Sequence, residues 1–133
     1  MEQTVFRILA ALLGIFALLN GGRMVADPIG WFASIPDLAL TGAANAHLIR
    51  DVGAAYLASA AGLGAAAFWP RLAAPLLLAP AIFMGGHALA HLADIAAGCA
   101  AAPGGTATDW LGVILPGALT IGFCVWALRF RRP

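Results

Sequence analysis

The stretch VFRILAALLGIFALLNGG, residues 5–22, decides the fold, because it is apolar throughout except for Arg7 and Asn20. A helix needs about 20 apolar residues to cross a hydrocarbon layer of about 30 Å, and three further stretches of the chain have that length and character. The fold class predicted is all-α, a four-span antiparallel transmembrane helix bundle in one membrane domain, residues 1–133. The predicted spans cover about 4–24, 46–69, 71–96 and 108–130, with an interfacial outer loop over 26–44.

The composition supports a multi-pass membrane protein whose main partner is the lipid bilayer. The 133 residues are 62% hydrophobic and only 10% charged, whereas a soluble domain carries about 25% charged residues. The mean hydropathy is +0.93. A formal charge of +1 gives no field that would attract nucleic acid, so nucleic-acid binding is excluded.

The arginines indicate the orientation of the four spans. Cytoplasmic loops of membrane proteins carry an excess of Lys and Arg. With four spans, five of the seven arginines fall on one side and only Arg23 and Arg50 on the other. The five are Arg7, Arg71, Arg129, Arg131 and Arg132. This distribution predicts that both termini and the turn at 69–71 are cytoplasmic.

The outer loop over 26–44 is long for a connection between helices, and it contains Trp31 next to Phe32. Aromatic side chains of this kind favour the headgroup region of a bilayer. The first interpretation is therefore an interfacial anchor formed by Trp31 and Phe32. The alternative is a lid that folds over the mouth of the bundle.

The few polar groups of the second and third spans are spaced so that they share helix faces. His87, His91 and Asp94 are related by i, i+4 and i+7, so they form one stripe. His47 and Asp51 form a similar pair on the second span, and Arg50 lies beside them. We call these six residues the predicted polar cluster: His47, Arg50, Asp51, His87, His91 and Asp94.

Helix geometry places both stripes at the same height. At about 1.5 Å per residue, His87 lies ~24 Å above Arg71, and Arg50 lies ~28 Å above Trp69. Both stripes therefore reach the outer boundary of the membrane. The two spans are joined by a tight turn, so they are expected to be neighbours. Polar groups that faced lipid would remain unpaired, and the two stripes are therefore expected to meet.

Three interpretations of this meeting remain open. The first is structural: Arg50 pairs with Asp94 or Asp51, and the histidines complete the hydrogen bonding. The second is a haem or transition-metal site formed by His47, His87 and His91, because imidazole suits zinc, copper and iron. The HALAH stretch has the i, i+4 spacing of helix-borne zinc ligands, but it lacks the glutamate of the metalloprotease motif.

The third interpretation is a polar pocket for a small molecule, a lipid headgroup or a quinone. Arg50 would then hold an anion, and a histidine would exchange protons, as imidazole does near neutral pH. Transport is disfavoured, because the inner halves of the second and third spans are apolar. Nucleophilic catalysis has little support, because no serine or cysteine lies beside a histidine at this height.

The sequence also resembles a family of small membrane proteins. Arg7, Gly14, the Asn20-Gly21-Gly22-Arg23 end of the first span and the stretch NAHLIRDVGAAYL (45–57) resemble small DoxX-like four-helix proteins and related uncharacterised bacterial families. The resemblance implies a four-helix bundle in a bacterial inner membrane, sometimes an accessory subunit of a redox system. It implies no catalytic residues, and it does not extend to GHALAHLAD (86–94).

Together these observations predict a small non-enzymatic membrane subunit or binding protein with a His/Arg/Asp cluster at the outer leaflet. A membrane-protein partner or a homo-oligomer would be compatible with its small-residue helix faces. The alternative function is a metal- or haem-binding redox protein that uses the three histidines.

Overall fold

The computed structural model describes residues 1–35 and 38–131, and every regular element in these ranges is helical. Residues 36 and 37 of the predicted outer loop, and Arg132 of the predicted cytoplasmic arginines, lie outside the described residues. The elements are α1 (Glu2–Ala26), α2 (Pro28–Ala33), η1 (Leu38–Thr41), α3 (Ala46–Phe68), η2 (Pro70–Leu72), α4 (Ala73–Leu76), α5 (Leu78–Ala96), η3 (Thr108–Ile114), α6 (Leu115–Ala127) and η4 (Leu128–Arg131).

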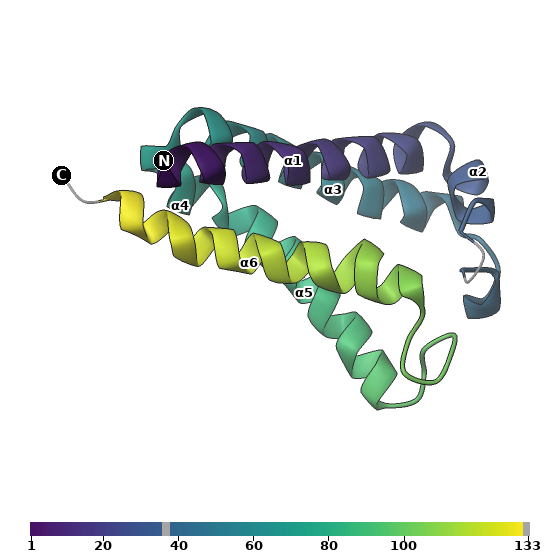
Figure 1. The fold of residues 1–133 in the computed structure, drawn as a ribbon. Coiled ribbons are helices and arrows are strands. Elements are labelled where there is room, and N and C mark those ends of the chain that lie inside the picture. Colours follow the sequence, from purple (N-terminus) through teal and green to yellow (C-terminus); the bar gives the residue numbers. More distant parts are fainter. Residues whose placement is uncertain (36–37, 132–133) are drawn as a thin grey trace.

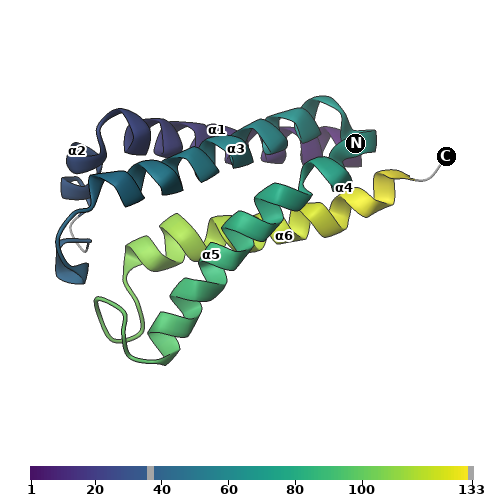
Figure 2. The ribbon, with the colours of Figure 1, turned by 180° about the vertical axis from the view of Figure 1, so that it is seen from behind.

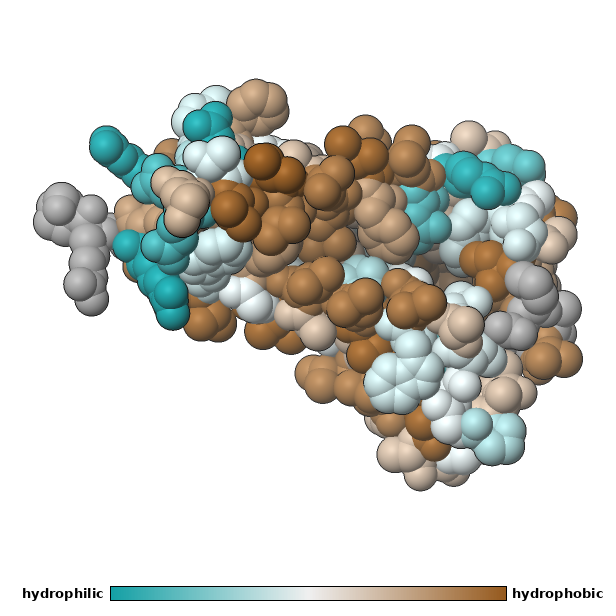
Figure 3. Space-filling model, in the orientation of Figure 1, coloured by the Kyte–Doolittle hydropathy of each residue, from teal (hydrophilic) through white to brown (hydrophobic). Residues whose placement is uncertain are grey.

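Within the described residues, four helical segments are long and apolar enough to cross a membrane, which confirms the number of predicted spans. These segments are Glu2–Ala26, Ala46–Phe68, Leu78–Ala96 and Thr108–Phe130. Large apolar side chains such as Leu12 and Ile82 are more than half exposed, and apolar residues cover much of the face seen in Figure 3. Water is a poor solvent for such a surface, so these helices belong in a lipid bilayer.

The third span differs from the prediction, because its long helix begins at Leu78 and not at 71. The segment before it is broken into η2 and α4. Pro75 and Pro80 have no N–H to donate to the preceding turn. The break at Leu77 lies between these two prolines.

The helices are arranged as two pairs that meet at one end of the molecule. α1 packs mainly on α3, and α5 packs mainly on α6. Figures 1 and 2 show the two pairs converging near the N-terminus and α4 and separating toward α2 and the loop that follows α5. The last turns of the chain also lie at the convergent end (Figure 1).

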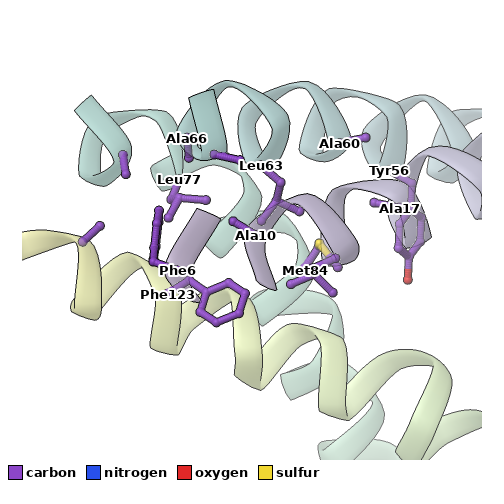
Figure 4. Packing of buried hydrophobic residues seen from close by; sticks show 14 of the residues in the cluster. Phe6, Ala10, Ala17, Tyr56, Ala60, Leu63, Ala66, Leu77, Met84 and Phe123 are labelled. Carbon is purple, nitrogen blue, oxygen red and sulfur yellow. The ribbon is translucent and has the colours of Figure 1, made fainter. Parts of the chain in front are cut away.

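Aromatic packing closes the convergent end. Phe6 is fully buried, and its ring makes edge contacts with Phe123, Trp126 and Phe130 at centroid distances of 6.0, 5.5 and 5.1 Å. Figure 4 shows Phe6 and Phe123 among the small side chains that line α1 and α3. The Trp126 indole also donates a hydrogen bond to Glu2 at 2.7 Å. The beginning of the first span and the end of the last span are therefore held together.

Candidate functional site

A cavity of about 350 Å³ lies between the two helix pairs on the side where they separate. Its aromatic wall includes Phe16 of α1, Trp31 and Phe32 of α2, and the ring of Tyr56 of α3. Its polar groups come mainly from the opposite pair, from α5, from η3 and from the loop that joins these two helices. Ligand sites in proteins usually have this character, with an apolar wall and a few polar groups that fix orientation.

His91 and Asp109 form the main polar feature of this cavity. Nδ1 of His91 lies 2.7 Å from Oδ1 of Asp109. The other carboxylate oxygen, Oδ2, accepts hydrogen bonds from the Thr106 backbone N–H at 2.7 Å and from the Thr106 hydroxyl at 3.0 Å. The Asp109 N–H donates in return to the Thr106 hydroxyl at 3.2 Å. These reciprocal bonds form a capping box at the start of the last span, and they hold the carboxylate against the imidazole.

The local backbone of the last span places Asp109 at the cavity. η3 is a π-helix, with hydrogen bonds that skip one more residue than in an α-helix. It ends just before Pro116, which has no N–H and interrupts the regular bonding pattern. Asp109 lies in the first turn of this widened segment. Asp109 is not part of the predicted polar cluster, although the Thr106-x-x-Asp109 spacing is a sequence signal for a capping box.

His87 lies between His91 and Tyr56 and makes only ring contacts. Its imidazole stacks on Phe83 at a centroid distance of 5.9 Å and meets the His91 ring edge-on at 4.8 Å. It also meets the Tyr56 ring edge-on at 6.2 Å. Neither ring nitrogen of His87 has a hydrogen-bond partner in the part of the chain that the structure describes. The ring borders the cavity, so its nitrogens are available to a bound molecule.

Tyr56 is the second polar group without a partner. Only 3% of the residue is exposed, and its hydroxyl has no hydrogen bond to any other described residue. No side-chain N or O atom in the described ranges is both inaccessible and unpaired, so the Tyr56 hydroxyl must reach open space. Tyr56 borders the cavity, and Figure 4 shows its hydroxyl pointing away from α3. Tyr56 is not among the site residues predicted from the sequence.

The other half of the predicted polar cluster lies elsewhere. His47 is on the outer surface, where 89% of its side chain is exposed, and it pairs with Asp51 at 3.5 Å. Arg50 donates from Nε to the Val25 carbonyl oxygen at 3.4 Å, across to α1. The expected pairing of Arg50 with Asp94 or Asp51 is therefore wrong. The separation of α3 and α5 toward this end (Figure 2) keeps Arg50 from Asp94. Arg50 and Asp51 are adjacent positions of α3, and side chains at i and i+1 of a helix do not face each other.

Of the six predicted residues, the structure brings His87, His91 and Asp94 to the cavity. Asp94 is exposed at its rim. The metal site formed by His47, His87 and His91 is not assembled, since His47 lies on the outer surface. Among the described residues, no group of three or more His, Cys, Asp or Glu side chains is arranged to hold a metal ion.

Trp31 and Phe32 line the cavity and pack against the core. The Trp31 indole donates a hydrogen bond to Oδ1 of Asn20 at 2.9 Å. α2 begins at Pro28, and the Asp27 side chain accepts from the Gly30 N–H at 3.0 Å. Both aromatic side chains are partly buried, so this placement favours the lid interpretation over the interfacial anchor.

Comparisons of the chain with protein-family models, with curated proteins and with solved structures found no match.

Proposed function

We propose that this chain is a non-enzymatic binding protein of a bacterial inner membrane, and that it holds a small amphiphilic molecule in the cavity between its two helix pairs. In this proposal the spans form an antiparallel bundle with cytoplasmic termini. The protein would resemble the small DoxX-like membrane proteins in size and layout, and it would act alone or as a subunit of a larger complex.

The cavity is the observation that carries this proposal. Its volume of about 350 Å³ lies within the range of about 300–1,000 Å³ found for small-molecule sites. Its wall combines an aromatic side with the polar groups Tyr56, His87 and His91. A molecule with an apolar body and a polar end matches both sides, and the bilayer supplies such molecules at high local concentration.

The arginines support the orientation. Arg7, Arg71 and Arg129 belong to the convergent end of the bundle, near the N-terminus, η2 and η4. The positive-inside tendency then places that end in the cytoplasm. The cavity would lie in the outer half of the membrane, with α2 above it on the periplasmic side.

A substitution that fills the cavity tests the proposal. Gly112 borders the cavity, and a Cβ added there would meet only the Thr108 methyl group, at an ordinary 3.7 Å. Gly112→Leu therefore places a new side chain in the cavity with little strain elsewhere. Gly122→Leu is the matched control, because Gly122 lies on the same span with no atom within 4 Å of an added Cβ, and it does not border the cavity.

The measurement is mass spectrometry of small molecules that co-purify with each protein from native membranes in mild detergent. We expect a specific amphiphile to be retained by the unmodified protein and by Gly122→Leu, and to be lost from Gly112→Leu. The same set of molecules in the same amounts on all three proteins would show that the cavity binds nothing specific.

A further inference from the structure

We propose that the bound molecule is an uncharged amphiphile with a hydroxyl group at its polar end, a lipid alcohol in chemical class. The Asp109 carboxylate fixes the ring nitrogen of His91 that accepts this hydroxyl. This inference rests on the proposed function, and it names the chemistry that the same cavity selects.

The charges around the cavity disfavour an anionic head. No Lys or Arg is among the described residues that line it, and its two charged side chains, Asp94 and Asp109, are both acidic. Arg50, the cation expected to hold an anion, does not border the cavity, and its Nε donates to the Val25 carbonyl oxygen. A phosphate or carboxylate head would therefore meet like charge without a counter-ion, which is costly in a medium of low dielectric constant.

The hydrogen-bonding groups select a head that can both donate and accept. The Asp109 carboxylate can only accept, so Nδ1 of a neutral His91 must carry the proton in their 2.7 Å contact. The hydrogen bond made by one ring nitrogen sets the tautomer of the imidazole. With the proton on Nδ1, Nε2 of His91 is unprotonated and is therefore an acceptor. No described residue donates to it. A ligand that reaches His91 must therefore bring its own donor.

Tyr56 supplies the complementary group. The residue is 3% exposed and its hydroxyl has no hydrogen-bond partner among the described residues, so the hydroxyl opens into the cavity, and a phenol can donate to an oxygen on the ligand. The His87 ring contacts both the Tyr56 and the His91 rings, so these groups line one continuous polar edge. An alcohol oxygen has the O–H that His91 requires and the lone pairs that Tyr56 requires. A cationic amine can donate to His91 and is attracted by the two carboxylates, but it has no lone pair to accept from the Tyr56 O–H.

Competition in a photo-crosslinking experiment tests this assignment. The full-length protein in lipid nanodiscs is crosslinked with dodecanol that carries a diazirine, in alkaline buffer, so that imidazole is neutral. The competitors are unlabelled dodecanol, its methyl ether, dodecanoate and dodecylamine. We expect dodecanol to compete about tenfold better than the ether, because the ether cannot donate to Nε2 of His91 and leaves this acceptor unpaired beside the ligand. The charged competitors are expected to be weaker than dodecanol.

Two conservative variants separate the roles of the polar groups. Asp109→Asn keeps an oxygen for Thr106 and turns an amide N–H toward His91, which moves the imidazole proton to Nε2. The advantage of dodecanol over its ether should then disappear or reverse. Tyr56→Phe removes only the donor, so dodecanol and ether should both weaken while their ratio stays near tenfold.

The outcomes distinguish this inference from the proposed function. In one outcome, Gly112→Leu abolishes crosslinking, but the ether or dodecanoate competes as well as dodecanol. This result would refute the lipid alcohol and would still support a binding cavity. An unchanged ratio in Asp109→Asn would refute the role of Asp109 in fixing the tautomer. If crosslinking is unchanged in Gly112→Leu, both proposals are refuted, because the probe then lies outside the cavity.

Discussion

Replacement of Gly21 by alanine is expected to separate α1 from α3 and to destabilise the protein. The two helices approach each other through facing glycines. A Cβ at Gly21 would lie 2.7 Å from the Gly53 carbonyl oxygen and 2.8 Å from the Tyr56 Cβ, where ordinary contact begins at 3.4 Å. The added methyl group is therefore about 0.7 Å too close to rigid backbone. No side-chain rotation can relieve this overlap.

Two opposing effects determine how much Gly21→Ala changes the free energy of unfolding. Overpacking a tight interface costs about 1–3 kcal/mol, and contact with backbone on a neighbouring helix places this site in the upper part of that range. Alanine favours a helix over glycine by about 1 kcal/mol. Gly22→Ala isolates this second effect, because an added Cβ at Gly22 meets nothing within 4 Å. Gly21→Ala should therefore be less stable than Gly22→Ala by about 2–3 kcal/mol.

Reversible unfolding in mixed dodecylmaltoside and sodium dodecyl sulfate micelles, followed by tryptophan fluorescence, measures this difference. Gly21→Ala should unfold at a lower fraction of sodium dodecyl sulfate than Gly22→Ala. The crosslinking yield in the cavity should also fall in Gly21→Ala, because Tyr56 is displaced with α3. Equal midpoints for the two variants would contradict the close contact of α1 and α3, and with it this account of the fold.

Three further predictions concern orientation and the histidines. A membrane-impermeant maleimide added to intact spheroplasts should label Cys99, which is exposed in the loop after α5. Cys124 within the last span serves as the unreactive control. Labelling of Cys99 only after lysis would reverse the proposed orientation. His47→Ala should change the free energy of unfolding in micelles by less than about 0.5 kcal/mol, because the side chain is 89% exposed. His91→Ala should cost about 1–2 kcal/mol in the same measurement through its lost bond to Asp109, and equal effects of the two substitutions would refute this division of the predicted polar cluster.

The number and type of long helices could be predicted from the sequence, because hydropathy and length act locally along the chain. The third helix shows the limit of this reasoning. Its apolar run is continuous from about 71, but Pro75 and Pro80 interrupt the hydrogen bonding, and the long helix begins only at Leu78. Hydropathy does not register a missing N–H, so the start of the span was placed about two turns too early.

The candidate site was predicted only in part, because spacing along one helix does not determine which helices face each other. The i, i+4 spacing correctly put His87 and His91 on one stripe, and both reach the cavity. The partner of His91 is Asp109, eighteen positions along the chain, and it comes from the last span and not from the second. α3 and α5 separate toward the end where the two stripes were expected to meet, so the stripes stay apart.

The separation itself follows from where small and large side chains lie between helices. At Gly62 of α3, an added Cβ would lie 2.7 Å from the Leu76 carbonyl oxygen and from Pro80, so α3 approaches the start of the third span closely. About two turns further toward the end where the pairs separate, Tyr56 of α3 meets Phe83 and His87 of α5 at 5.3 and 6.2 Å between ring centroids. Rings of this size hold the helices apart where glycine lets them touch. Because helices in a bilayer associate through close packing, small residues decide where the two pairs join, and the aromatic residues between them determine where the cavity opens.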